Sequence, residues 1–497
     1  MARKATIGKR VSAAIAICAL AALGSPAQTC TTLASFHHAN GANPAATLVQ
    51  ATSGDLFGTT AGGGTNVLPN GTGGTVFKIS PRVGISTLHS FCALANCADG
   101  ALPAAPLVQA TNGDLHGTTY EGGPTAGGTV FKITQSGTLT TVYGFCSLAN
   151  CADGEEPVAG LVQATNGGLY GTTANGGAGV DCVVPYGCGT IFKITPSGAL
   201  TTIYNFCSLA DCADGQSPWA GLVQATNGDL YGTTYEGGAH GGGTVFRMTP
   251  SGTLTTLYSF CALANCADGA NPEAGLVQAT NGKLYGTTYY GGANCQANVP
   301  AGCGTVFEII PSGTLTTLYS FCALANCADG ANPEAGLAQA NNGDLYGTTQ
   351  AGAANGSGAI FQITPSDTLT TVSSFSFECG DGSTPSALVQ ATNGGLYGTM
   401  YYGGADGAGT IFSLSLGLGP FVESLPTAGK VGSPAKILGT NLTGATSVTF
   451  NGTATVFNVA SPTLITTTVP TGATSGKIQV VTPSVTLSSD MPFRVLP

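Results

Sequence analysis

Short apolar stretches bounded by glycine turns recur along most of the chain. The stretch GLVQATNGDLYGTTYEGG at 221–238 has close relatives that begin at Leu48, Leu107, Leu161, Leu276, Leu337 and Leu388. Each copy belongs to a longer unit that also contains a segment like GTVFKITPSGTLTTLYSF, so residues up to about 416 repeat one module seven times. Alternating apolar and polar positions in short runs predict β-strands, and no segment has a convincing helical period.

Each unit predicts four short strands in two hairpins. Asn-Gly, as at Asn227–Gly228, lies between LVQAT and DLYGTT, and a tight hairpin turn of this kind needs positive φ at both central residues. Pro-Ser-Gly, as at Pro250–Gly252, joins the other two strands; proline presets the first turn residue and glycine takes the left-handed position. A single four-stranded sheet cannot bury both faces, so seven of them stacked around an axis predict a β-propeller.

The two ends of the repeat region complement each other. The segment Thr31–Phe36 matches a fourth strand with no unit before it, and Gly409–Gly417 matches a third strand with no fourth after it. We therefore predict that the N-terminal strand completes the last blade and closes the ring, which removes open sheet edges. The alternative is an open solenoid with a capping strand, although solenoids need no matched ends.

Strand direction sorts the connections into two faces. Both tight turns of every unit fall on one face, and the links between units and the long loops within them fall on the other. Loops on a rigid scaffold lie at the surface and commonly carry binding groups. We therefore expect a ligand on the long-loop face.

The repeats, through NGxLYGTT, GTVFKIT and LYSF, resemble the GloVer-type tandem-repeat family of exported bacterial proteins, a resemblance that implies no particular activity. Residues 418–497 have short alternating strands, glycine and proline turns and no cysteine, which predicts a small β-sandwich. They resemble the IPT/TIG family, which implies an immunoglobulin-like fold with a binding or spacer role. The resemblance is carried by Pro420, Gly439–Leu442, Val448–Gly452, Val469–Pro470, Gly476, Ile478 and Val480. The predicted fold is therefore all-β, with a seven-bladed β-propeller at 28–417 followed by this sandwich.

The N-terminus predicts export. Residues 1–27 combine the basic segment MARKATIGKR, the apolar segment VSAAIAICALAALG and the small-residue end SPA, a pattern typical of a signal peptide. The apolar run is short for a membrane span, and a retained N-terminal anchor is the alternative. We expect a secreted mature protein with no membrane span.

Charge excludes two classes of partner. The formal net charge is −10, and removal of Arg3, Lys4, Lys9 and Arg10 with the predicted signal peptide changes it to −14 (−10 minus 4). An acidic chain with scattered basic residues argues against nucleic acid and anionic lipid as partners. An extracellular glycan or protein is the partner class that remains.

Close cysteine pairs predict disulfides, because the chain is expected to be exported. Seven pairs are spaced in this way: Cys92/Cys97, Cys146/Cys151, Cys182/Cys188, Cys207/Cys212, Cys261/Cys266, Cys295/Cys303 and Cys322/Cys327. The third and the sixth of these pairs lie in insertions that lengthen two of the long loops. Thiolate zinc sites need four ligands, usually at tighter spacing, so we predict no metal and no cofactor. The pairing of Cys30 and Cys379 stays open at this point.

Candidate chemistry lies on the long-loop face. The repeated acids have a turn role as the first interpretation and calcium or ligand contact as the alternative: Asp99, Asp153, Asp214, Asp268, Asp329 and Asp381. Aromatic and acidic residues at the loops suit sugar stacking and hydrogen bonding, although the first tyrosine of each pair can instead pack between blades. These ligand-binding candidates are Tyr120, Glu121, Trp219, Tyr235, Glu236, Tyr289, Tyr290, Tyr401 and Tyr402.

Three functions are compatible with these patterns. A secreted, non-enzymatic binding protein is favoured, because near-identical units suit repeated contacts and no catalytic motif has its required context. A polysaccharide-active enzyme would need two carboxylates near the axis and one unit that departs from the others. A purely structural cell-surface repeat protein is the third hypothesis. We name no catalytic residue.

Overall fold

A computed structural model describes residues 29–66, 73–80, 84–179, 182, 187–295, 303–375 and 382–497. The predicted signal peptide at 1–27, Cys379 and Asp381 lie outside the described residues. Within the described ranges the chain is all-β, and its helices are five single 3₁₀ turns. No helix in this part of the chain is long and apolar enough to cross a membrane.

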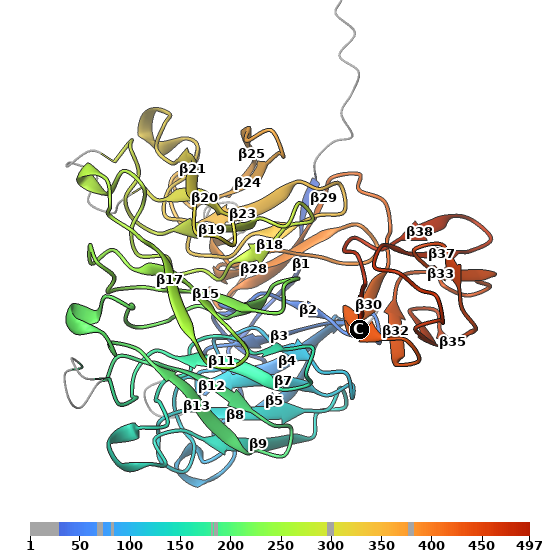
Figure 1. The fold of residues 1–497 in the computed structure, drawn as a ribbon, viewed down its shortest axis with the longest axis horizontal. Coiled ribbons are helices and arrows are strands. Elements are labelled where there is room, and N and C mark those ends of the chain that lie inside the picture. The colour runs from blue at the N-terminus through green and yellow to red at the C-terminus, as the bar shows by residue number, and fades with distance from the viewer. Residues whose placement is uncertain are drawn as a thin grey trace, which may run out of the picture.

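Residues 29–415 form seven antiparallel sheets that follow one another along the chain (Figure 1). The first three sheets contain β2 (Val49–Gln50), β3 (Leu56–Thr60), β4 (Thr75–Ser80) and β5 (Gly84–Ser90); β6 (Val108–Gln109), β7 (Leu115–Thr119), β8 (Thr129–Ile133) and β9 (Leu139–Gly144); and β10 (Val162–Gln163), β11 (Leu169–Thr173), β12 (Thr190–Ile194) and β13 (Leu200–Asn205). The next three contain β14 (Val223–Gln224), β15 (Leu230–Thr234), β16 (Thr244–Met248) and β17 (Leu254–Ser259); β18 (Val277–Gln278), β19 (Leu284–Thr288), β20 (Thr305–Ile309) and β21 (Leu315–Ser320); and β22 (Ala338–Gln339), β23 (Leu345–Thr349), β24 (Ala359–Ile363) and β25 (Leu369–Ser374). The last contains β1 (Thr29–Ser35), β26 (Ser383–Pro385), β27 (Val389–Gln390), β28 (Leu396–Tyr402) and β29 (Thr410–Ser415).

The second and third strands of each sheet are buried because they are packed on both faces. In β15, LYGTT is buried at all five positions, and in β16 only Arg247 of TVFRM is partly exposed. The glycine of LYGTT is required by this packing: a Cβ on Gly232 would lie 2.6 Å from the ring of Phe246. The fourth strand, β17, is the outer and more exposed one.

Phenylalanine rings join each sheet to the next. The phenylalanine that ends a fourth strand contacts the phenylalanine of the following sheet's third strand, with ring centroids 4.9–5.4 Å apart at all seven joints. One of these joints, Phe36 on Phe77, connects the last sheet back to the first. Aromatic contacts of this kind contribute beyond their buried area.

A cycle of glutamine hydrogen bonds runs through the same seven sheets. The side-chain oxygen of each LVQ or LAQ glutamine accepts from a backbone N–H in the preceding sheet's Asn-Gly turn, or in the Ser53–Gly54 turn of the first sheet, at 2.7–2.9 Å. Its amide Nε2 donates to the glycine carbonyl of its own turn. The bond from Thr392 N–H to Gln50 returns to the first sheet, so the sheets form a closed circuit.

The predicted pairing of the N-terminal segment with the last sheet is observed. Strand β1 is antiparallel to β29, from Thr29 opposite Ser415 to Ser35 opposite Thr410, with an irregularity between Thr32 and Ala34. Phe36, directly after β1, is 1% exposed. The outer edge of β29 is therefore covered by a strand more than 370 residues away in sequence.

The Asn-Gly turn differs from the sequence prediction. In the second sheet only the glycine, Gly113, has positive φ (102°), and its N–H donates to the carbonyl of Ala110 while Ala110 N–H donates to Asp114. The loop is therefore longer than two residues, and Asn112 instead accepts from Asp114 N–H with its side chain. The positive φ predicted for both residues was wrong, because this Asx bond satisfies the turn.

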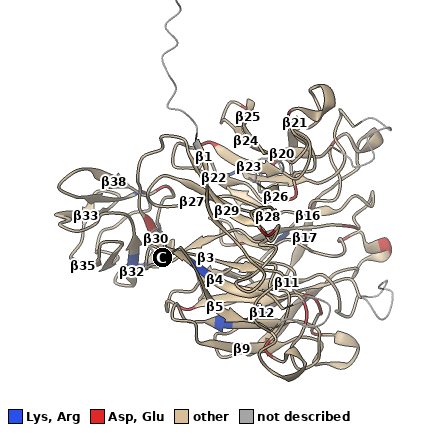
Figure 2. Ribbon diagram, turned by 180° about the vertical axis from the view of Figure 1, so that it is seen from behind, with Lys and Arg blue, Asp and Glu red and all other residues tan. Residues whose placement is uncertain are grey.

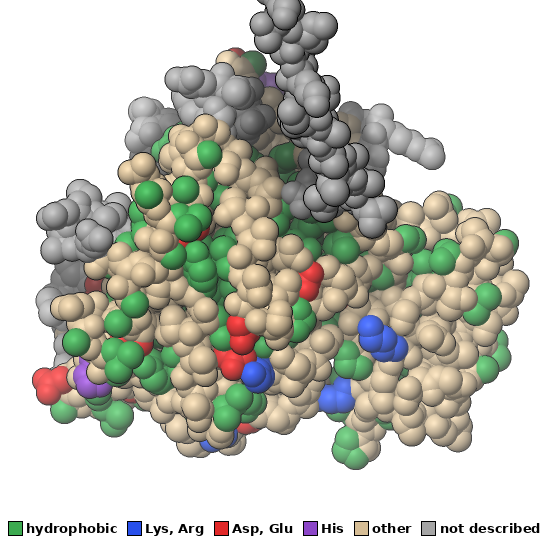
Figure 3. Space-filling view, turned by 90° about the horizontal axis from the view of Figure 1, so that it is seen from above, with side chains coloured by type: hydrophobic (Ala, Val, Ile, Leu, Met, Phe, Trp, Pro, Cys, Tyr) green, Lys and Arg blue, Asp and Glu red, His purple; other side chains and the backbone are tan. Residues whose placement is uncertain are grey.

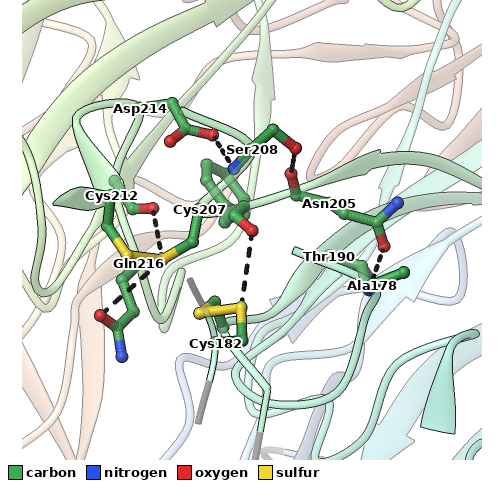
Figure 4. Close-up of a disulfide and its surroundings, with 12 residues drawn as sticks. Ala178, Cys182, Thr190, Asn205, Cys207, Ser208, Cys212, Asp214 and Gln216 are labelled. Carbon is green, nitrogen blue, oxygen red and sulfur yellow. Dashed lines mark hydrogen bonds between the residues drawn. A yellow bond between two sulfur atoms is a disulfide. The ribbon is translucent and has the colours of Figure 1, made fainter. Parts of the chain in front are cut away.

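The seven predicted disulfides are present, and each repeated pair closes a loop around a buried aspartate. The five repeated loops contain the helical turns η1 (Ala95–Cys97), η2 (Ala149–Cys151), η3 (Ala210–Cys212), η4 (Ala264–Cys266) and η5 (Ala325–Cys327). In the third sheet's loop, Asp214 accepts from Ser208 N–H at 3.0 Å (Figure 4). It also accepts from Leu209 N–H at 3.1 Å and from Tyr204 Oη–H at 2.8 Å. The turn role of these acids is therefore structural. Cys182 lies close to Cys207, but both sulfurs are in disulfides.

The two disulfides of the insertions each have one buried cysteine. Cys188 is 1% exposed and Cys303 is 0% exposed. Cys303 lies just before β20 and packs in an apolar cluster with Phe321, and its carbonyl accepts from Asn332 N–H at 2.9 Å. Cys303 is therefore a core residue at the point where the insertion meets the third strand of its sheet. Its predicted pairing with Cys295 is confirmed.

Removal of the aspartate should destabilise its loop. Asp214 is fully buried, and Asp214→Ala would leave two backbone N–H groups and one phenol without their acceptor. We expect the free energy of unfolding, measured in urea, to fall by about 3 kcal/mol. Asp406→Ala, at an exposed loop position, is the control and should change it by less than about 0.5 kcal/mol. Equal effects of the two variants would contradict a supporting role for Asp214.

The remaining residues form a module that covers the tight-turn end of the repeat sheets (Figure 1). One sheet contains β30 (Glu423–Leu425), β32 (Pro434–Leu438), β36 (Leu464–Thr468) and β35 (Phe457–Ser461); a second contains β34 (Thr453–Ala454), β33 (Ser447–Phe450), β37 (Ile478–Val481) and β38 (Thr486–Ser488); and β31 (Ala428–Lys430) pairs in parallel with β39 (Arg494–Leu496). The two larger sheets share one apolar core. Lys436 Nζ donates to Thr111 O at 2.8 Å, Thr463 Oγ1 donates to Thr52 O at 3.4 Å, and Arg494 donates to Thr226 O. These acceptors all lie in Asn-Gly turns or the matching turn of the first sheet, so the module packs on the tight-turn end of the repeat sheets.

Candidate functional site

A cavity of about 1000 Å³ lies where the seven links converge on the long-loop side. Its wall is built mainly from two repeated positions. One is the link segment that precedes each first strand, and the other is the residue that follows GTT at the end of the second strand in the five middle units. The links approach one another closely, since a Cβ on Gly221 would lie 3.2 Å from Gly160 O and one on Gly275 3.1 Å from Gly221 O. Glycine at these positions allows the links to meet around the cavity.

The link residue after the shared proline differs from unit to unit, although its surroundings barely change. In chain order this residue is Ala45, Ala104, Val158, Trp219, Glu273, Glu334 and Ser386. All except Ser386 line the cavity. One side of the cavity is therefore small and apolar, and the other carries an indole and two carboxyl groups.

Aromatic rings cover the wall beside these groups. The rings of Trp219 and Tyr235 are stacked, with centroids 4.4 Å apart and an interplanar angle of 5°. Tyr289 and Tyr290 meet edge to face at 4.6 Å. Trp219 is 43% exposed, so one face of its indole is open to a ligand.

Hydrogen bonds fix the polar groups on this side. Tyr289 Oη–H donates to Gln350 Oε1 at 2.6 Å, and Gln350 Nε2 donates to Glu334 Oε2 at 2.8 Å. This relay orients the Gln350 amide so that its N–H points at the carboxyl group. At another part of the wall, Asn175 Nδ2 donates to Glu156, and burial and Glu156 together raise the pKa of Tyr120 to about 12.

The cavity disfavours charge on its acids. Burial, and then repulsion from Glu334, raises the pKa of Glu273 to about 8. Glu334 is accessible from the cavity, yet the surrounding walls still raise its pKa above the ordinary value. Burial followed by the nearby carboxyl groups raises the pKa of Tyr235 and of Tyr289 to about 12. At neutral pH the phenols are therefore protonated, and so is most of the Glu273 population.

This environment predicts a pH-dependent contribution to stability. The pKa of Glu273 is about 8 in the folded chain and 4.5 in the unfolded one, so folding favours the protonated acid. Its stability contribution is fully present below pH 4.5 and is lost as the pH rises towards 8. Glutamine resembles the protonated acid at every pH. We expect Glu273→Gln to raise the melting temperature by roughly 2 °C at pH 8.5 and to leave it unchanged at pH 4.5.

The control for this measurement is Glu121→Gln, which changes an exposed acid outside the cavity wall. Its melting temperature should follow that of the unmodified chain across the same pH range. A Glu273→Gln profile parallel to that of the unmodified chain would contradict the assignment of a buried, protonated carboxyl group.

Five of the nine predicted binding residues line this cavity: Tyr120, Trp219, Tyr235, Tyr289 and Tyr290. Glu121, Glu236, Tyr401 and Tyr402 are not among its lining residues. Glu121 and Glu236 directly follow the inward-facing tyrosines, and both are exposed outside the cavity. Tyr401 and Tyr402 pack edge to face on each other.

The sequence prediction missed Glu273, Glu334 and Gln350. All three stand at positions shared by every unit, so a search for one divergent unit passed over them. Variation at a single position in otherwise near-identical units is the signal that identifies them.

Charged side chains are few in this protein, at 8% of its residues. Acidic and basic side chains are scattered over the ribbon in Figure 2, and uncharged atoms predominate on the side of the molecule seen in Figure 3. None of the described residues that line the cavity is Lys, Arg or His. The cavity therefore offers carboxyl groups, phenols, an indole and amides to a ligand.

The fold is similar to that of propeller-like proteins of known structure. A fungal alcohol oxidase of the AA5 family, in complex with copper, matches 95% of this chain and 100% of its own at 11% identity and a TM-score of 0.52. The periplasmic gluconolactonase of Pseudomonas aeruginosa matches 73% of this chain and 97% of its own at 17% identity and a TM-score of 0.42. Such identities concern the fold alone. Copper prefers imidazole or sulfur ligands, and the described cavity wall contains neither histidine nor cysteine, so its residues do not fit that metal.

The sequence match found for this chain is to its repeated unit. No curated protein sequence matches the chain. The model of the Gloeobacter/Verrucomicrobia repeat matches four overlapping stretches, residues 19–185, 147–324, 183–412 and 295–455, which together span most of the sequence. The chain belongs to the Gloeobacter/Verrucomicrobia repeat family.

Proposed function

We propose that the chain is a secreted carbohydrate-binding protein whose single binding site is the central cavity on the long-loop side. The observation that carries this proposal is the asymmetry of the cavity wall. Trp219, Tyr235 and Tyr289 stand with Glu273 and Glu334 on one side, opposite the small residues of the first units. A wall of this kind binds one ligand in one orientation rather than seven ligands in equivalent places.

The chemistry of the wall supports a sugar. Aromatic side chains contribute a large apolar surface together with a polar group, which suits the apolar face and the hydroxyl groups of a pyranose ring. Carboxyl, amide and phenol groups supply both donors and acceptors at fixed positions. Few, precisely placed polar groups in a largely apolar cavity are typical of small-molecule sites.

The proposal includes the architecture of the chain and its export. The seven sheets act as the blades of a seven-bladed β-propeller closed by the N-terminal strand, supported by the circuit of seven phenylalanine and seven glutamine contacts. Residues 418–497 act as an immunoglobulin-like domain of the IPT/TIG type, supported by two sheets around one core. Seven disulfides fit an oxidising compartment, and residues 1–27 direct the chain there as a signal peptide.

The test is binding of soluble oligosaccharides to the purified chain, first on a glycan array and then by calorimetric titration. We expect dissociation constants in the micromolar range, and loss of binding when Trp219 is replaced. Absence of binding to every glycan on the array, by protein with intact disulfides, would contradict the proposal.

Glycoside hydrolysis is a second candidate, favoured by one observation. Glu273 and Glu334 face the same cavity and both have raised pKa values, and a raised pKa allows a carboxyl group to act as a general acid at neutral pH. A retaining or inverting enzyme needs one such acid and one ionised partner. Release of reducing ends from a bound oligosaccharide, lost in Glu273→Gln and Glu334→Gln, would establish an enzyme; binding without release would establish a binding protein.

A further inference from the structure

We infer that the central cavity selects amino sugars, with the ammonium group of the ligand held between the carboxylates of Glu273 and Glu334 and against the neighbouring aromatic rings. This inference rests on the proposed carbohydrate-binding function and specifies its ligand class. It depends on three features of the cavity: its charged groups, its unused hydrogen-bond acceptors and its rings.

The charged groups of the cavity wall have one sign. Glu156, Glu273 and Glu334 line it, and no described lining residue carries a positive charge. Two carboxylates that face the same space repel each other when both ionise. A cation placed between them removes this repulsion, so the wall favours a positively charged group over a neutral or negative one.

The carboxyl groups also have unused acceptors. Within the described residues Glu334 accepts one side-chain hydrogen bond, from Gln350, and no hydrogen bond to the Glu273 carboxyl group is found. An ionised carboxylate can accept at about four positions, and an ammonium group has three donors to offer. Two carboxylates can therefore accept all three hydrogen bonds of an ammonium group while Glu334 keeps its bond from Gln350.

Aromatic rings complete the surroundings of such a cation. Trp219, Tyr235, Tyr289 and Tyr290 line the same part of the cavity as the two acids. The faces of these rings attract cations, and the attraction strengthens where water is excluded. A hydroxyl group gains no comparable attraction from a ring face. The rings, like the carboxylates, therefore favour an ammonium group over a hydroxyl group.

Ammonium binding requires ionised carboxyl groups and therefore releases protons from the cavity. The titratable groups that interact with Glu273 and Glu334 are the Glu334 carboxyl, which acts on Glu273, and the phenols Tyr235, Tyr289 and Tyr401. These three phenols have raised pKa values and stay protonated in the range tested. The proton released below pH 7 therefore comes from the carboxyl pair.

The experiment is calorimetric titration of the full mature chain with a glucosamine oligomer and an N-acetylglucosamine oligomer of the same length. At pH 6 the amine is charged, and we expect the glucosamine oligomer to bind at least tenfold more tightly. Between pH 5 and pH 6 its affinity should rise about tenfold if one proton is released, and repetition in buffers of different ionisation enthalpy counts that proton. The affinity for the N-acetylated oligomer should be nearly constant.

Two variants test the residues. Glu273→Gln and Glu334→Gln should each weaken binding of the glucosamine oligomer at least tenfold, remove the pH dependence that their carboxyl group supplies, and change N-acetylglucosamine binding less than threefold. Glu121→Gln, outside the cavity, is the matched control and should bind both as the unmodified chain does. The pH series on the unmodified chain tests the inference even if a variant fails to fold.

The outcomes separate this inference from the proposed function. Equal or tighter binding of the N-acetylated oligomer, or binding of neutral glycans alone, overturns the selection for amino sugars and leaves a carbohydrate-binding cavity. Binding of no oligosaccharide at all overturns both. Amine-selective binding that survives both substitutions overturns the placement of the ammonium group.

Discussion

Replacement of Trp219 by alanine is expected to weaken oligosaccharide binding at least about 30-fold, which corresponds to about 2 kcal/mol. The indole is the largest side chain on the polar side of the cavity, and its stack on Tyr235 leaves its other face accessible. A preordered ring provides contact area without an ordering cost at binding. The measurement is the dissociation constant for the tightest glycan found on the array.

The matched control for this prediction is Tyr402→Ala. Tyr402 is also a half-exposed aromatic residue on the long-loop side, at 48%, but it does not line the cavity. Its replacement should change the dissociation constant less than twofold. If the two variants lose affinity equally, the ligand occupies the loop rim rather than the cavity.

Deletion of residues 29–36 is expected to lower the free energy of unfolding by at least about 4 kcal/mol and to make unfolding less cooperative. The deletion removes β1 from the edge of β29, and with it Phe36, whose ring packs on Phe77 of the first sheet. The last joint of the circuit would open, and an unpaired edge also favours aggregation. Denaturation in urea and the retention volume in gel filtration measure the two effects.

The repeat itself supplies a control for the deletion. The segment TCTTLASF at 29–36 differs from TLTTLYSF at 253–260 at two positions only. The double variant Cys30→Leu, Ala34→Tyr therefore gives β1 the sequence of an internal fourth strand. It should unfold at or above the midpoint of the unmodified chain, and a loss as large as that of the deletion would contradict a role for β1 as a fourth strand.

The architecture was predictable because the sequence signals that specify it are local and repeated. Asn-Gly, Pro-Ser-Gly and the LYGTT strand specify hairpins within one unit, and the unmatched strands at the two ends predict the pairing of β1 with β29 that is observed. The error at the Asn-Gly turn arose because the dipeptide alone does not reveal that Asn112 bonds Asp114 and that the loop is longer. The burial of Cys303 could not be predicted either, since the spacing of a cysteine pair does not show where an insertion re-enters the sheet.

The site was less predictable, because the cavity depends on which repeated positions face the axis. The links were recognised as one face of the fold, yet nothing local distinguishes the inward Glu273 from the outward Glu236. The position of the C-terminal module was also not predictable, since Lys436 and Arg494 reach turn carbonyls that lie far from them in sequence. Comparison of the units position by position would have identified the cavity wall, because its residues vary where the scaffold does not.

The most direct test of the account is the stoichiometry of glycan binding, measured by calorimetric titration at protein concentrations well above the dissociation constant. One asymmetric cavity predicts one ligand for each chain. Two or more equivalent ligands for each chain would place binding on the repeated loops and contradict a central site.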